Sequence, residues 1–161
     1  MTITGNFIGG KTGISSSNET MPGYDPAAGK TGGEVTGSTA QEISQASQGA
    51  RDAFDSWSRT TPLRRARGLF NFKMLLEQHV EELAGIIVSE HGKVWSDALG
   101  ELTRGMEVVE FACGIPHLIK GEYSSDVGTG VDSYSLMPPL GGGAGITPFN
   151  FPAVVPVGLV P

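Results

Sequence analysis

The sequence has one cysteine, few basic residues and no long apolar run, and each shortage excludes a class of protein. A single cysteine cannot form an internal disulfide, which is typical of proteins in a reducing compartment. The 11 lysines and arginines are outnumbered by 17 acidic residues, and the net charge of −6 argues against a nucleic-acid partner. No stretch approaches the roughly 20 apolar residues of a membrane span. We therefore expect a cytoplasmic protein that binds neither nucleic acid nor membrane.

The two ends of the chain also lack familiar signals. The N-terminus has neither the basic start and apolar stretch of a secretory signal nor the arginine-rich pattern of a transit peptide. Residues 150–161 carry no charge, and no Gly or Asn cap closes them. We therefore expect the polypeptide to continue beyond Pro161.

The first half of the sequence changes from a strand pattern to a helix pattern. Residues 1–37 are rich in glycine, serine and threonine with short alternations, which predicts short strands and turns. A capping box beginning at Ser38 or Thr39 then opens a helix that runs to Trp57. Pro62 opens a second helix, whose apolar face continues without a break to a stop at Gly92.

The second half begins with a third helix and then returns to strands. This helix is expected to start at Ser96 and to end or kink at Pro116. Residues 131–136 alternate as a strand, which Met137-Pro-Pro139 should end because proline has no amide hydrogen. Residues 140–147 are rich in glycine but return to the apolar Ala144 and Ile146, and we expect a last strand here, followed by a turn and a helix. The order indicates an α/β fold without a complete parallel sheet.

Asn150 is the residue whose surroundings favour chemistry most clearly. It lies between Pro148 and Pro152, which restrict the backbone on both sides. A stiffly held amide NH₂ could stabilise a developing negative charge, as in an oxyanion hole. Asn is also a favoured residue at the start of a helix, so capping is the alternative interpretation.

Cys113, the single cysteine, is a candidate nucleophile. Its spacing to His117 suits a thiolate pair, but Pro116 interrupts the helix between them. Because Cys113 falls on the apolar stripe of the third helix, we interpret it as a core residue. The histidines lack metal-ligand spacing, so no metal site is expected. The basic cluster at Arg64, Arg65 and Arg67 is interpreted as a solvated helix face.

Four stretches share their order and spacing with one known family. The first three are Arg64-Arg-Ala-Arg-Gly-Leu-Phe-Asn-Phe72, Glu90-His-Gly-Lys93 with Asp97-Ala-Leu-Gly-Glu-Leu-Thr-Arg-Gly105, and Glu107-Val-Val-Glu-Phe-Ala112. The fourth is Gly145-Ile-Thr-Pro-Phe-Asn-Phe-Pro-Ala-Val-Val-Pro156. Together they resemble the aldehyde dehydrogenase superfamily, most closely its CoA-acylating methylmalonate-semialdehyde (malonate-semialdehyde) dehydrogenases. The resemblance covers the N-terminal third of such an enzyme.

This resemblance implies an incomplete aldehyde dehydrogenase-like α/β fold with three parts. Residues 1–121 would be the N-terminal part of the NAD-binding domain, residues 122–140 a strand segment of the oligomerising type, and residues 141–161 the truncated start of a Rossmann-like core. Two differences from the family are evident. Gly141-Gly-Gly143 replaces an apolar strand, which weakens sheet pairing. The first hairpin, residues 9–13, lacks an aromatic, and Asp25 stands where Asn is usual; we expect both to be tolerated.

The resemblance also implies roles for particular residues. Asn150 would belong to the oxyanion hole, and Arg104 would hold the carboxylate of the substrate, since a guanidinium can grip a carboxylate with two hydrogen bonds. An ordinary surface pair of Arg104 with Glu101 or Glu107 is the alternative. The residues placed along the nicotinamide cofactor would be Ile146, Thr147, Pro148 and Phe149.

The activity implied is NAD-dependent oxidation of methylmalonate or malonate semialdehyde to an acyl-CoA through a cysteine thioester. NAD would be the cofactor, coenzyme A a co-substrate, and the complete enzyme a homo-oligomer, either a dimer or a tetramer. In the resembled family the nucleophilic cysteine and the general base lie beyond the position of Pro161, so the 161-residue chain is expected to be inactive alone. A non-catalytic interaction module, or an NAD(P)-dependent aldehyde dehydrogenase with a different substrate, is the alternative.

Overall fold

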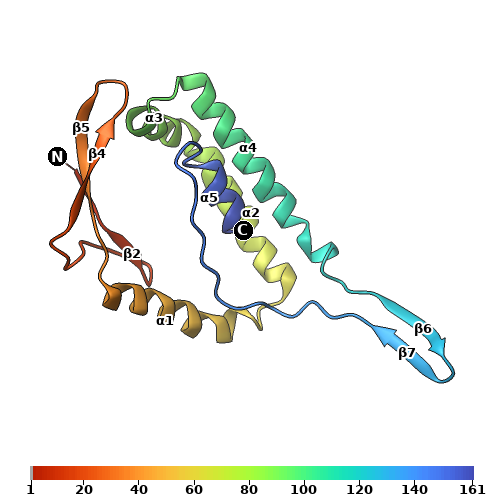
Figure 1. Ribbon diagram of the computed structural model, residues 1–161. Coiled ribbons are helices and arrows are strands. Elements are labelled where there is room, and N and C mark those ends of the chain that lie inside the picture. Colours follow the sequence, from red (N-terminus) through yellow and green to blue (C-terminus); the bar gives the residue numbers. More distant parts are fainter. Residues whose placement is uncertain (1) are drawn as a thin grey trace.

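The structure is a computed structural model that describes residues 2–161. Figure 1 shows a small N-terminal sheet, a group of helices beside it, and a hairpin that projects away from the helices. The chain then returns from the hairpin, and the last short helix lies against the helical group. This return brings the turn around Asn150 to the helices.

The N-terminal strands form one sheet and one separate hairpin. The sheet has the order β1 (Thr2–Thr4), β5 (Lys30–Thr36) and β4 (Thr20–Asp25), in which β1 is parallel to β5 and β4 is antiparallel to it. The hairpin pairs β2 (Asn6–Ile8) with β3 (Lys11–Gly13), and its turn residues Gly9 and Gly10 have φ of 60° and 78°. Glycine adopts such angles most readily, because it has no Cβ. The prediction of short strands and a tight hairpin is confirmed.

Asp25 supports the turn between β4 and β5. Its Oδ1 accepts hydrogen bonds from the amides of Ala27 at 2.9 Å and Ala28 at 3.2 Å. An aspartate carboxylate can accept here as an asparagine carbonyl would, which explains why Asp25 is tolerated at this position.

Helix α1 (Ala40–Trp57) begins at the second of the two expected capping boxes. The Thr39 hydroxyl accepts from the Glu42 amide, and a Glu42 carboxylate oxygen accepts from the Thr39 amide at 2.8 Å. The same carboxylate accepts from the Ser15 hydroxyl at 2.6 Å and from the Ser16 amide at 2.9 Å. Glu42 therefore joins the start of α1 to the loop before β4.

The structure divides the expected second helix into two helices. Helix α2 (Pro62–Gln78) ends and α3 (Val80–His91) begins at His79, whose φ of −109° and ψ of 14° are not helical. The prediction of one continuous helix was wrong because no proline or glycine marks the break. The bend lets both helices pack against the next helix, α4. The expected stop at Gly92 is confirmed by its left-handed φ of 79°.

Helix α4 (Trp95–Cys113) carries most of the buried residues. The main cluster joins Ala84 and Ile87 of α3 to Ala98 and Leu102 of α4. Cys113 is buried at the end of α4, and a short 3₁₀ helix (Ile115–His117) follows at Pro116. The helix begins one residue before the predicted Ser96 and ends before Pro116 as expected, and the core position of Cys113 is confirmed.

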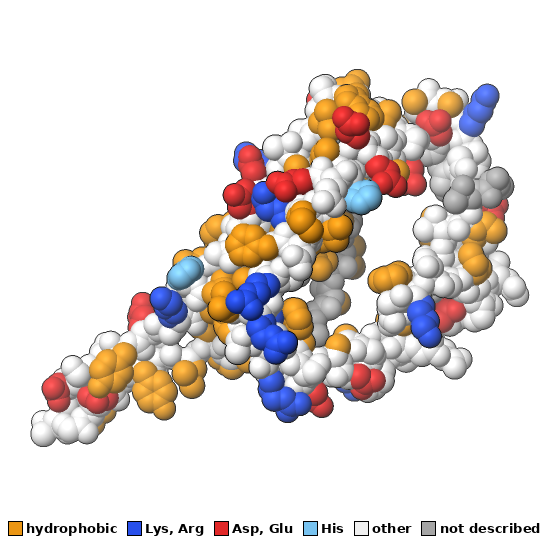
Figure 2. Space-filling view, turned by 180° about the vertical axis from the view of Figure 1, so that it is seen from behind, with side chains coloured by type: hydrophobic (Ala, Val, Ile, Leu, Met, Phe, Trp, Pro, Cys, Tyr) orange, Lys and Arg blue, Asp and Glu red, His pale blue; other side chains and the backbone are white. Residues whose placement is uncertain are grey.

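The projecting hairpin pairs β6 (Tyr123–Gly128) with β7 (Val131–Tyr134). The sequence pattern predicted only the second strand, because serine and glycine obscure the alternation of the first. Every residue of both strands is exposed, and Figure 2 shows hydrophobic side chains along the projection. Nothing within residues 2–161 covers this hairpin.

The strand expected at residues 140–147 does not form. Residues 135–148 have no regular secondary structure, and Gly141 has a φ of 111°. A strand needs a neighbouring strand for its backbone hydrogen bonds, and the described residues offer none beside this segment. The predicted helix does form after the turn, as α5 (Val154–Leu159).

Glu42 makes the stability of the fold sensitive to acid. The Ser15 hydrogen bond, with those from the amides of Thr39 and Ser16, lowers the pKa of Glu42 to about 2. A depressed pKa stabilises the folded state above the ordinary value of 4.5, and this contribution is lost as the pH falls toward 2. We expect Glu42→Gln to destabilise the protein at pH 7, and the deficit to shrink as the pH falls through this window. Urea unfolding at several pH values measures this; an equal deficit at all pH values would contradict it. Glu110→Gln is the control on an exposed carboxylate.

Gly105 sets how closely α5 approaches α4. A Cβ at this position would lie 3.4 Å from Cγ1 of Val157 and 3.5 Å from the Cα of Val154. We expect Gly105→Val to force the helices apart and cost about 1–3 kcal/mol. Gly105→Ala should be nearly neutral, because its gain in helix propensity offsets the tight contact. Chemical unfolding of the two variants makes the comparison, and equal stability of Gly105→Val and the original chain would refute the close approach.

Candidate active site

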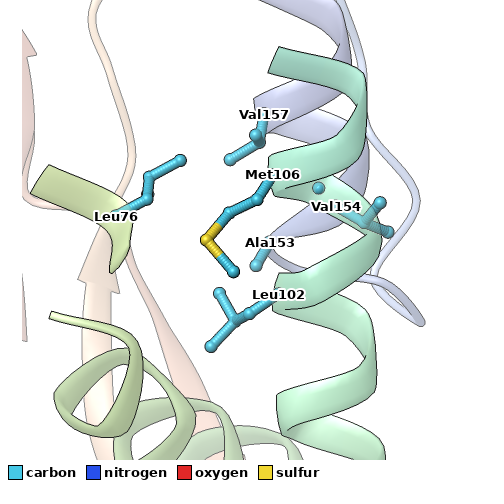
Figure 3. Close-up of a pocket in the computed structure, with 7 residues that line it drawn as sticks. Leu76, Leu102, Met106, Ala153, Val154 and Val157 are labelled. Atoms are coloured by element: carbon cyan, nitrogen blue, oxygen red, sulfur yellow. The ribbon is translucent and has the colours of Figure 1, made fainter. Parts of the chain in front are cut away.

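The turn that carries Asn150 is held against α4 by the start of α5. Figure 3 shows the residues that line the contact: Ala153, Val154 and Val157 at α5, Leu102 and Met106 of α4, and Leu76 of α2. The space between them is about 10 Å³, enough for at most one water molecule. This small pocket is a packing contact and not a binding site.

Glu101 of α4 makes the polar contacts that fix this turn. Its side chain is 1% exposed, and its Oε1 accepts from the amides of Ala153 at 2.7 Å and Val154 at 3.1 Å. These amides lie at the start of α5, where a helix has no internal acceptors for them. The carboxylate of Glu101 therefore acts as an external cap for α5.

Lys93 balances the charge of Glu101. Its Nζ donates to Glu101 Oε2 at 2.5 Å, and its side chain is 14% exposed. Burial opposes ionisation of Glu101, but the hydrogen bonds from Lys93 and from the amides of Ala153 and Val154 outweigh it, and its pKa is lowered. The same ammonium lies 4.2 Å from the centroid of the Phe151 ring, within the range of a cation–π contact.

Sequence reasoning did not assign this role to Glu101 or Lys93. Glu101 was considered only as a possible surface partner of Arg104. A signal was present, because Glu101 lies three residues after Ala98 and four before Gly105, on the buried stripe of α4. A carboxylate buried on such a stripe requires a cation or hydrogen-bond donors as partners. The position of Glu101 therefore predicts such partners.

Asn150 is exposed in the turn between Pro148 and Pro152. The N-cap of α5 is Ala153, so the capping alternative for Asn150 is wrong. Its side-chain amide makes no hydrogen bond to another described residue, and it is therefore free to donate to a ligand. Because Phe151 and Ala153 are both fixed, the backbone that carries this amide is tied on its C-terminal side.

The four residues expected along a cofactor lie directly before Asn150. Ile146, Thr147, Pro148 and Phe149 are all exposed in a segment without regular structure, so their backbone polar groups are not used in a sheet or helix. The ring of Phe149 is 87% exposed and borders a groove of about 680 Å³. The other wall of this groove is α3, through Leu83, Ile86, Ile87 and His91.

Arg104 lies on the exposed face of α4. Its side chain is 74% exposed, and its Nη1 donates to Glu107 at 2.5 Å. One of the two surface pairs considered for Arg104 is therefore present, whereas Glu101 is engaged elsewhere. An exposed pair of this kind contributes little stability and leaves the guanidinium available to a stronger carboxylate ligand.

Cys113 is unsuited to nucleophilic attack in this structure. Burial raises the pKa of its thiol, which leaves it protonated, and only a thiolate is reactive. Within residues 2–161, no three side chains of His, Cys, Asp or Glu gather as metal ligands. Among the same residues, no helix is both long and apolar enough to cross a membrane.

Comparison with known proteins identifies the family of this chain. The model of the aldehyde dehydrogenase family matches residues 14–161. The chain is 45% identical over 160 residues to malonate-semialdehyde dehydrogenase 1 of Geobacillus kaustophilus (strain HTA426), covering 99% of this chain and 33% of that protein. It is also 45% identical to malonate-semialdehyde dehydrogenase of Pseudomonas aeruginosa over 138 residues, or 86% of this chain and 28% of the relative.

Solved structures give the same result. The methylmalonate-semialdehyde dehydrogenase of Oceanimonas doudoroffii has a TM-score of 0.92 and 46% identity, over 98% of this chain and 32% of that one. A protein of Sinorhizobium meliloti 1021, solved as a complex with NAD, has a TM-score of 0.93 and 42% identity, with the same coverage. The chain spans about a third of the length of the curated relatives it matches. On the family match and these identities, the chain belongs to the aldehyde dehydrogenase family.

Proposed function

We propose that this chain is the N-terminal part of an NAD-dependent, CoA-acylating dehydrogenase of malonate or methylmalonate semialdehyde. The observation that carries the proposal is the exposed amide of Asn150, which has no partner among the described residues, on a turn fixed by Glu101. The names of the relatives, malonate- and methylmalonate-semialdehyde dehydrogenases, support the substrate class. The complex of the Sinorhizobium meliloti protein with NAD supports the cofactor.

Asn150 supplies electrostatic stabilisation in this proposal. When a cysteine thiolate from the rest of the enzyme attacks the aldehyde carbon, the carbonyl oxygen gains negative charge. The side-chain NH₂ of Asn150 donates to that oxygen, and its preset position avoids reorganisation during the reaction. Loss of hydride from this thiohemiacetal to the nicotinamide cofactor would give a thioester. Its acyl group would then pass to the thiol of coenzyme A, which releases the cysteine thiolate.

Residues 146–149 supply one wall of the cofactor site. They suit this role because their backbone is free of secondary structure and because Ile146 and Phe149 present apolar surface that a flat ring can contact. NAD held there would supply the acceptor for the hydride that leaves the substrate. The part played by this chain is to orient the nicotinamide and to exclude water from its face.

Arg104 recognises the substrate through its distal carboxylate. The guanidinium is exposed on α4, three residues beyond Glu101, on the helix that holds the Asn150 turn. Exchange of the Glu107 partner for the substrate carboxylate keeps the cation paired. Specificity for a semialdehyde that carries an acid group follows from this pairing.

The projecting hairpin is proposed as the surface through which copies of the complete enzyme pair. Its two tyrosines, Tyr123 and Tyr134, and the following Leu136 and Met137 are exposed large side chains. Contiguous exposed apolar surface of this kind is typical of an interface. A homodimer or homotetramer is the assembly expected.

The proposal requires residues that residues 2–161 do not supply. We expect purified residues 1–161 to produce no NADH with malonate semialdehyde, NAD and CoA. A fusion protein, made by joining Pro161 to the C-terminal two thirds of the Geobacillus kaustophilus relative, should produce NADH. NADH production by the 161-residue chain alone would refute the claim that the C-terminal two thirds of such an enzyme are required. A folded but inactive fusion protein, beside an active intact relative, would instead favour the non-catalytic module.

Replacing Asn150 tests the oxyanion role. Asn150→Ala in the fusion protein should lower kcat by on the order of a hundredfold, because one donor to the developing charge is lost. NAD affinity should change little, since the adjacent backbone is retained. Steady-state kinetics and NAD titration measure the two effects. Asn150→Asp, which keeps the shape but removes the donor, is the control; an unchanged kcat in both variants would eliminate the role.

Replacing Arg104 tests substrate recognition. Arg104→Gln in the fusion protein should raise KM for malonate semialdehyde by about tenfold or more and leave oxidation of propanal, which lacks the carboxylate, unaffected. Glu107→Gln is the matched control, because it removes the surface pair while keeping the guanidinium. If the two variants behave alike toward both aldehydes, Arg104 is a surface residue only.

A further inference from the structure

The Asn150 turn is attached at two places, and both attachments meet at one buried charge pair, formed by Lys93 in the loop before α4 and Glu101 on α4. Glu101 Oε1 holds the amides of Ala153 and Val154, after the turn. Glu101 Oε2 holds Lys93 Nζ, which in turn lies over the ring of Phe151, the residue next to Asn150. The pair therefore grips the residues that follow Asn150 through both backbone and side chain.

Lys93 and Glu101 can fix the position of the turn because the two side chains do not separate easily. The Glu101 side chain is 1% exposed and that of Lys93 is 14% exposed, so separation would leave a charge in a poorly solvated site. Pro148 and Pro152 stiffen the turn internally but do not set its distance from the helices. Only a contact between the turn and α4 sets that distance.

The same helix carries the residue assigned to the substrate carboxylate. Glu101 and Arg104 are three residues apart on α4, within one helical turn. A rigid link from Glu101 to the Asn150 turn therefore fixes the spacing between the group that binds one end of the substrate and the group that stabilises the charge at the other end. Displacement of about 1 Å in such a pair of groups can cost on the order of a hundredfold in rate.

We propose that Glu101 and Lys93 are positioning residues, which set the place of the Asn150 amide relative to Arg104 by clamping residues 151–154 onto α4. The inference rests on the proposed oxyanion role of Asn150. Neither residue touches the substrate, and both act through the turn. Their loss should therefore lower kcat and leave NAD binding almost unchanged.

The kinetic test uses the fusion protein with three variants and a control. Lys93→Met removes the cation over Phe151, and Glu101→Gln removes the charge while keeping the side-chain shape. Each should lower kcat about tenfold or more, with KM for NAD within about twofold of the original. Lys93→Arg keeps the donor and the cation–π contact and should restore most of kcat. Glu77→Gln breaks the exposed Lys73 pair and should change neither constant.

A second measurement reads the clamp without relying on activity. Amide hydrogen exchange of the 161-residue chain should show faster exchange at Ala153 and Val154 in Lys93→Met and Glu101→Gln, and protection close to the original in Lys93→Arg and Glu77→Gln. Unchanged protection at these amides would overturn the clamp, whatever the kinetics. Faster exchange with an unchanged kcat in an active fusion protein would overturn the positioning role. Suppose that Asn150→Ala has no effect on kcat, but the amides of Ala153 and Val154 lose protection in Lys93→Met and Glu101→Gln. The proposed oxyanion role then fails, whereas the clamp is supported.

Discussion

The buried carboxylate of Glu101 is the constraint on which the arrangement of the candidate site depends. A carboxylate that is 1% exposed needs partners for its oxygens, and the structure supplies an ammonium on one side and two helix-terminal amides on the other. Each partner is also stabilised by this contact. Lys93 keeps its charge balanced, and α5, which has only six residues, gains the acceptors that its first amides lack. One side chain therefore connects the loop that carries Lys93, the long helix α4 and the turn that carries Asn150.

Apolar packing of α5 on α4 adds to the polar contact made by Glu101. Gly105, one turn after Glu101, leaves room for Val154 and Val157 to approach the backbone of α4. Leu102 and Met106 fill the remaining space, which is too small for a ligand. The C-terminal turn is thus held by a specific hydrogen-bonded pair at its start and by close packing directly after it, while the four residues before Asn150 stay exposed. This division separates a fixed part of the turn from a part that is open to a partner.

The features that sequence reasoning predicted correctly are those decided by neighbouring residues. The capping box at Thr39, the left-handed Gly92 and the apolar stripe ending at Cys113 are all local patterns, and the structure confirms each of them. The errors concern contacts made over a distance. The strand expected at residues 140–147 needs a partner strand that the described residues do not contain, and the break at His79 serves packing on α4 and not a local preference.

The candidate site also combines features set by neighbouring residues with contacts between residues that are distant in the sequence. Asn150 was found because two prolines and two aromatics surround it in the sequence, but its capping alternative could be excluded only by locating the true start of α5 at Ala153. Glu101 was overlooked because its partners include amides 52 and 53 residues further along the chain, and Lys93 because it pairs with that same carboxylate. No periodicity reports a contact of that kind. The family likeness pointed to the turn but did not show what holds it.

The separation of 52 residues between Glu101 and its first amide partner also has a consequence for the order of folding. Lys93 is only eight residues from Glu101, so this pair can close as soon as α3 and α4 meet. The turn must then return past the projecting hairpin and find a carboxylate that is already paired on one side. Because closing a loop costs entropy that grows with its length, the short-range pair is favoured to form first and the turn to dock last. During synthesis, one carboxylate oxygen of Glu101 would therefore be paired before the residues of the Asn150 turn are available to bind the other.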